Sequence, residues 1–194
     1  MLRHARIVLS AATLVLSVLT LNAQDDGSRK FEVGAWSRPV DGLRGRLLAT
    51  RGKDFVGTRM VDVYLELQNV SDVGNPMEVY FDDQRSLNSR VLDVDGKPLK
   101  QPPTAASIVS PGPYWLVVPW DGTLRFRVSV SVYGIYRESG TDIPMASGNW
   151  VIAPNDKKQY FLESDLSASG AKEKPHAWQG TLHLPRVLIA HKHF

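Results

Sequence analysis

Hydrophobic and polar residues alternate along much of the chain after residue 30. In Leu124–Val132 every second residue is apolar and the residues between them are arginine or serine; Met60–Asn69 repeats the pattern with valine and leucine. Successive side chains of a β-strand point to opposite faces, so this period predicts strands with one buried face. A helix would distribute the same valines around its whole circumference and restrict their rotamers. Both segments are therefore predicted to be half-buried strands.

Shorter segments extend this pattern, because they are rich in strand-forming residues and bounded by turn residues. They are Leu43–Ala49, Met77–Phe81, Arg90–Val94, Tyr114–Val118, Trp150–Ala153, Gln159–Leu166 and Trp178–Leu184. Prolines in Lys97–Pro113 predict a long loop, and Ser167–Pro175 reads as a second one. The irregular loop lengths favour an all-β fold, an immunoglobulin-like antiparallel β-sandwich of about 8–9 strands, over an up-and-down barrel. A single domain is expected over residues 36–190.

The first residues have the three parts of a secretory signal. Two arginines precede an uncharged stretch of 15 residues, Ile7–Leu21, and a small residue, Ala23, stands before polar Gln24. As a helix the stretch would span about 22 Å, short of the roughly 30 Å hydrocarbon core of a bilayer. We expect cleavage between Ala23 and Gln24, with a retained anchor helix as the alternative. Residues 24–35 are expected to be a flexible N-terminal segment, and residues 191–194 a tail.

The chain of 194 residues contains no cysteine. This excludes disulfides, thiolate metal sites and a cysteine nucleophile. Exported eukaryotic domains usually carry disulfides, so the composition favours a protein of the bacterial periplasm or extracellular medium. The formal net charge falls from +3 to +1 when the signal is removed, because 21 basic and 20 acidic residues then remain. The basic residues are also dispersed, so no nucleic-acid partner is expected.

One stretch carries a family resemblance. Residues 36–43 form a Trp-x(3)-Val-x-Gly-Leu opening, and the following strand ends in Asn69-Val70-Ser71. This pattern resembles one found in uncharacterised secreted bacterial proteins, and the resemblance continues through Val94–Pro98 and Trp178–Pro185. It implies an immunoglobulin-like sandwich, but no activity and no functional residues. The pattern of Asn69–Phe81 is also similar to that of sandwich domains resembling the intracellular proteinase inhibitor, a similarity of fold alone.

Aromatic residues near predicted strand ends are the main candidates for a binding site. Exported sandwiches can bind sugars on exposed aromatic rings, which cover the apolar face of a pyranose. The alternative is that these rings fill the ends of the core. Trp120, which is flanked by proline and aspartate, is the best candidate for an exposed ring. The complete set is Trp115, Trp120, Tyr133, Tyr136 and Trp150.

Signals for catalysis and metal binding are weak. No Gly-x-Ser-x-Gly motif occurs, and every histidine beyond the signal lies within the last 19 residues. His183 is expected to be an exposed strand residue, and the Asp82-Asp83 pair a solvated turn. His191 and His193 could together hold a metal weakly, although a frayed terminus is the simpler interpretation. No catalytic residue and no cofactor is predicted.

These observations favour an exported, non-catalytic binding or interaction module. The expected ligand is an unknown protein or carbohydrate, and no membrane span is expected in the mature form. The alternatives are a secreted hydrolase acting on polysaccharide or peptide, and a protease-inhibitor-like sandwich. An enzyme needs a cleft with suitably placed carboxylates or histidines, whereas a binding module needs exposed aromatic or apolar surface.

Overall fold

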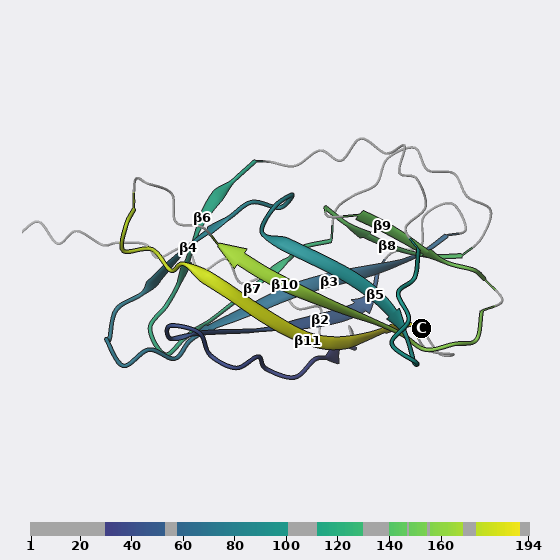
Figure 1. The fold of residues 1–194 in the computed structure, drawn as a ribbon, viewed down its shortest axis with the longest axis horizontal. Helices are drawn as coiled ribbons and strands as arrows, with labels where there is room; N and C mark the ends of the chain where they lie inside the picture. Colours follow the sequence, from purple (N-terminus) through teal and green to yellow (C-terminus); the bar gives the residue numbers. More distant parts are fainter. Residues whose placement is uncertain are drawn as a thin grey trace, which may run out of the picture.

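The chain folds into β-strands joined by turns and loops (Figure 1). The computed structural model describes residues 30–52, 58–100, 112–129, 140–146, 148–154, 156–168 and 174–190. Within these ranges there are eleven strands and no helix, which confirms the all-β prediction. The predicted number of strands, about 8–9, was too low. No helix in this part of the chain is long and apolar enough to cross a membrane.

The larger sheet is organised around β3 (Thr58–Asn69), its longest strand. Along one edge β3 pairs with β2 (Leu43–Arg51), which in turn pairs with the short β1 (Glu32–Val33). The other edge is shared: β8 (Gly140–Met145) pairs in parallel with Thr58–Met60, and β7 (Thr123–Arg127) pairs antiparallel with Tyr64–Gln68. The outermost strand is β9 (Gly148–Ile152), in a hairpin with β8.

A second layer consists of a three-stranded sheet and a two-stranded pair. In the sheet, β10 (Tyr160–Ala168) lies between β11 (Gly180–Ala190) and β5 (Leu87–Asp93). The pair is β4 (Met77–Phe81) with β6 (Tyr114–Val118). Trp178 N donates to Glu78 O at 2.8 Å and so links β4 to the chain entering β11. In Figure 1, β4 and β6 lie at one end of the molecule and the β8–β9 hairpin at the other.

One hydrophobic core joins the two layers. It includes fully buried leucines of β2 and β3 on one side and of β10 and β11 on the other: Leu43, Leu47, Leu65, Leu67, Leu162, Leu166, Leu182 and Leu184. Gly45 allows a close approach, because a Cβ atom there would lie 2.8 Å from Leu184 Cδ2. A Cβ on Gly34 would lie 3.4 Å from Val187 Cβ, so the chain beside β1 also contacts β11. Residues 30–35, expected to be flexible, thus include a paired strand.

The strands missed by the sequence analysis are β1 and β8. β1 is only two residues long, and β8 contains Pro144, which argues against a central strand. The structure accommodates this proline because the pairing with β3 involves only Gly140–Asp142. Pro144 lies beyond that stretch, opposite Asn149 of β9.

Two strand ends also differ from the prediction. β7 ends at Arg127 instead of continuing to Val132, since the amides of Val128 and Ser129 both donate to Val63 O, at 2.9 and 3.2 Å; residues 130–132 lie outside the described part. β11 continues to Ala190, past Pro185 and the predicted strand end at Leu184. Leu184 pairs with Ser164 and Val187 with Leu162, so the proline sits in a β-bulge, where no ladder bond is lost.

Position 42, in the turn before β2, requires glycine for two separate reasons. Val40 and Leu43 exchange backbone hydrogen bonds of 2.9 and 3.0 Å, and both residues between them have positive φ, 46° at Asp41 and 78° at Gly42. A Cβ on Gly42 would also lie 2.6 Å from Ser71 Cβ and 3.0 Å from Ser71 Cα. Gly96 has nearly the same φ, 79°, but nothing within 4 Å of a Cβ.

We therefore expect Gly42→Ala to destabilise the protein more than Gly96→Ala. Both variants place alanine in the left-handed region, at a cost of about 1–2 kcal/mol, and Gly42→Ala adds a clash with Ser71 of roughly 1–3 kcal/mol. Urea denaturation of the two variants and the parent would measure the difference. Equal losses of stability would show that the contact with Ser71 relaxes freely.

Candidate functional site

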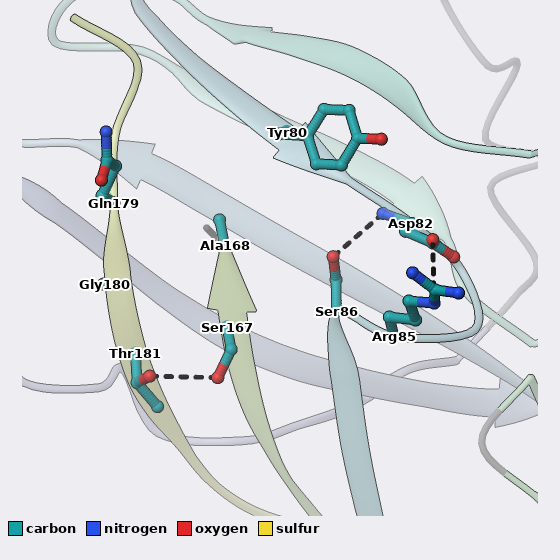
Figure 2. A pocket seen from close by; sticks show the side chains of 9 residues that line it. All are labelled: Tyr80, Asp82, Arg85, Ser86, Ser167, Ala168, Gln179, Gly180 and Thr181. Carbon is teal, nitrogen blue, oxygen red and sulfur yellow. Dashed lines mark hydrogen bonds and ion pairs between the residues drawn. The ribbon is translucent and has the colours of Figure 1, made fainter. Parts of the chain in front are cut away.

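A pocket of about 490 Å³ opens where the turn between β4 and β5 meets the adjoining ends of β10 and β11. Figure 2 shows the side chains around it, which come from both sides of the opening. The lining residues are mostly polar: Tyr80, Asp82, Arg85, Ser86, Ser167, Ala168, Gln179, Gly180 and Thr181. The second layer thus forms the pocket alone, at the end of the molecule where β4 and β6 lie.

Hydrogen bonds hold the turn that forms one wall. Asp82 O accepts from the amides of Arg85 and Ser86, at 3.0 and 2.8 Å, and Ser86 Oγ accepts from Asp82 N at 2.9 Å. Ser167 N then donates to Ser86 O at 2.8 Å, which ties β10 to the turn. Because the backbone is bonded on both sides, the polar side chains project from a fixed frame.

The side chains of the pocket offer both hydrogen-bond donors and acceptors. The hydroxyls of Ser167 and Thr181 lie 3.0 Å apart on neighbouring strands, and Arg85 Nε lies 3.9 Å from Asp82 Oδ2. Asp82 is the only carboxylate among the nine lining residues, and none of the nine is a histidine. The pocket can therefore offer a polar molecule both hydrogen-bond donors and acceptors.

Trp115, one of the predicted aromatic residues, lies opposite Tyr80 on the neighbouring strand, beside the pocket. Its ring packs edge-on against Tyr80, with centroids 5.2 Å apart, and Tyr80 lines the pocket. Lys174 Nζ lies 4.6 Å from the centroid of the Trp115 ring and 2.6 Å from Glu78 Oε1. These contacts fix the indole and, through it, the position of the tyrosine.

Of the other predicted aromatic residues, the two that the structure describes, Trp120 and Trp150, do not line this pocket. Trp120 is 53% exposed, and its indole N–H donates to Ser71 O at 3.1 Å, so the ring is held at the surface. It lies five residues beyond Trp115, about 16 Å along an extended chain. Trp150 is 2% exposed and belongs to the core, as the core-filling alternative expects. Tyr133 and Tyr136 lie outside the described residues.

Histidine and metal predictions have a similarly mixed outcome. His183 is exposed, as predicted, and its Nδ1 lies 2.8 Å from Asp165 Oδ1 on the neighbouring strand. His191 and His193 lie outside the described part, as do Ala23 and Gln24 at the expected cleavage site. Among the described residues, no group of three or more His, Cys, Asp or Glu side chains could hold a metal ion.

Most of the pocket was missed by the sequence analysis, because its residues come from separate segments. The one local signal was the Asp82-Asp83 turn, which was interpreted only as solvated. Gln84 N donates to Asp82 Oδ1 at 2.9 Å, so the turn has the expected aspartate bond. Nothing in the sequence indicates that β10 and β11 bring Ser167 and Thr181 beside this turn.

No protein-family model matches the chain, and no similar protein was found among curated proteins or solved structures.

Tyr114 anchors the turn of the pocket to β6 and gives a measurable titration. Its hydroxyl donates to Asp83 Oδ1 at 3.3 Å. Burial, followed by the charge of Asp83 and this hydrogen bond, raises the pKa of Tyr114 from 10.0 to about 12. The folded state thus holds this proton more tightly than the unfolded state, so the stabilisation is complete below pH 10.0 and is lost as the pH rises to about 12.

We predict that Asp83→Asn lowers the pKa of Tyr114 without restoring it to 10.0, because burial, the largest cause, remains. Ultraviolet absorbance of tyrosinate across an alkaline titration would measure this, with Tyr114→Phe assigning the transition. Tyr160 serves as the internal control, since its pKa of about 12 is raised by burial and by Asp156. An unchanged Tyr114 transition in Asp83→Asn would contradict the assigned contribution of Asp83.

Proposed function

We propose that this protein is an exported, non-catalytic binding domain whose pocket takes a neutral saccharide. The observation that carries the proposal is the chemistry of the pocket lining. Three aliphatic hydroxyls, an amide, a carboxylate and a guanidinium accompany the ring of Tyr80 around a space of about 490 Å³. Such a volume lies within the range of about 300–1,000 Å³ typical of small-molecule sites.

A saccharide suits this lining because each of its hydroxyls both donates and accepts hydrogen bonds. The hydroxyls of Ser167 and Thr181 and the amide of Gln179 have the same dual capacity. Tyr80 adds an aromatic surface against which the C–H face of a pyranose can pack. The packing of Trp115 against Tyr80 supports a preformed site, and preorganisation reduces the entropic cost of binding.

Binding is favoured over glycoside hydrolysis. Hydrolysis ordinarily uses two carboxyl groups about 5–10 Å apart across the sugar. The described lining provides one, Asp82, and it faces Arg85. A protein–protein role gains its main support from the exposed and fixed ring of Trp120, which makes that residue a second place to test.

The signal pattern of the first 23 residues supports export, and the absence of cysteine supports a bacterial source. We further propose that the two layers form an immunoglobulin-like sandwich, as in the secreted bacterial proteins whose sequence pattern this chain resembles. The support for this architecture is the single core shared by mainly antiparallel sheets.

A glycan array probed with the purified protein would test the saccharide proposal, followed by titration calorimetry with the best neutral oligosaccharide. Thr181→Val should weaken binding roughly three- to tenfold, because it removes a hydrogen-bonding hydroxyl and leaves the shape of the side chain nearly unchanged. Thr123→Val is the matched control, since Thr123 is an exposed threonine at the start of a strand in the other sheet. Its affinity should equal that of the parent.

Two outcomes would overturn the assignment to the pocket. One is the absence of any glycan signal above background. The other is loss of binding in Trp120→Ala with unchanged affinity in Thr181→Val, which would place the ligand at the exposed indole.

A further inference from the structure

The outer face of the larger sheet carries an arginine lattice, in which β2 and β7 provide the arginines and β3, between them, provides carboxylates. The register places Arg46 opposite Glu66 and Glu66 opposite Arg125, while Arg44 lies opposite Gln68. Arg127, farther along β7, contacts Asp62 of β3. The described outward positions of these strands thus hold four arginines and two carboxylates: Arg44, Arg46, Arg125, Arg127, Asp62 and Glu66.

The carboxylates lie beneath the guanidinium groups. Glu66 Oε1 accepts from Nε and Nη2 of Arg125, at 3.2 and 2.9 Å, and its other oxygen accepts from Arg46. Arg127 Nη2 lies 2.7 Å from Asp62 Oδ1. The side chains of Glu66 and Asp62 are only 6% and 10% exposed, whereas those of Arg125 and Arg127 are 39% and 43% exposed. Solvent therefore meets a cationic face rather than a neutral one.

Arg44 also contributes a positive charge to this face, and its described contacts include no carboxylate that would neutralise it. Its Nε and Nη2 both donate to the neutral Gln68 Oε1, at 2.9 and 2.7 Å. The ring of Trp36 lies beside it, with its centroid 4.9 Å from Arg44 Cζ and 4.3 Å from Arg46 Cζ. Because stacking and hydrogen bonds already fix these side chains, less conformational entropy would be lost when they bind an anion.

The spacing of the arginines fits a regular linear polymer. Arg44 and Arg46 are two residues apart on one strand, which separates them by about 7 Å, and β2 and β7 flank β3 at a total separation of about 10 Å. Guanidinium groups bind carboxylate and sulfate oxygens in pairs, which favours these groups over neutral hydroxyls. Stacked arginines occupy the ring of Trp36, so it is poorly placed to stack on nucleobases.

We infer that the outer face of β2, β3 and β7 binds an acidic polysaccharide through Arg44, Arg46, Arg125 and Arg127. This site is separate from the pocket, which the second layer forms on its own.

The binding of polygalacturonate and dextran sulfate to the purified protein would test this inference, with neutral dextran and single-stranded oligothymidylate as comparisons. Arg44→Gln should weaken binding to an acidic polysaccharide roughly three- to tenfold and reduce its salt dependence, because one charged contact is lost. Gln68→Glu is a second, independent variant. It gives Arg44 a carboxylate partner and removes one net positive charge from the face, so it should weaken binding in the same direction.

Arg90→Gln is the matched control, since Arg90 is a half-exposed arginine of the other sheet that pairs with Glu163 and Asp165. This variant and the pocket variant Thr181→Val should bind acidic polysaccharide like the parent. Circular dichroism melting would verify that each variant is folded. Failure to bind either acidic polymer at low salt, equal weakening by Arg90→Gln, or tighter binding of oligothymidylate would each overturn the inference.

Discussion

The packing of leucines between the two layers is the interaction on which the other features depend. The chain has no cysteine, and its described residues form no metal cluster, so burial of apolar area is the main favourable term for the part of the fold seen here. Each buried leucine contributes about 2 kcal/mol. Gly45 lets Leu184 approach β2, which keeps the layers in close contact. The pocket and the arginine lattice lie on elements that this packing holds in place.

Strand register connects the core with the surface. Because side chains alternate, the register that directs Leu65 and Leu67 of β3 into the core also directs Glu66 outward, between arginines of the two neighbouring strands. A shift by one residue would bury the charged residues and expose the leucines. The preference for burying the leucines therefore determines both the core and the order of the charged residues on the outer face.

Local patterns predicted much of the fold. The bounds of β4 and β6 agree with the prediction, and β2, β3 and β10 differ only at their ends, since alternation and turn residues are local signals. β8 contains Pro144, and a proline is compatible with a strand only where its missing amide is not needed for pairing. The sequence alone does not show which residues of β8 pair with β3 and which pair with β9. The burial of Trp150 and the assembly of the pocket likewise depend on long-range pairing. Ser86, Ser167 and Thr181 line one pocket, although nothing in their sequence spacing indicates that they lie close together.

The contact between the chain beside β1 and β11 has a kinetic consequence. Gly34 and Val187 are almost as far apart in sequence as any two described residues, yet a Cβ on Gly34 would lie only 3.4 Å from Val187 Cβ. Contacts of such high sequence separation are formed late and slowly, because most of the chain must be synthesised and ordered first. The nascent polypeptide would therefore remain without its completed core throughout most of its synthesis.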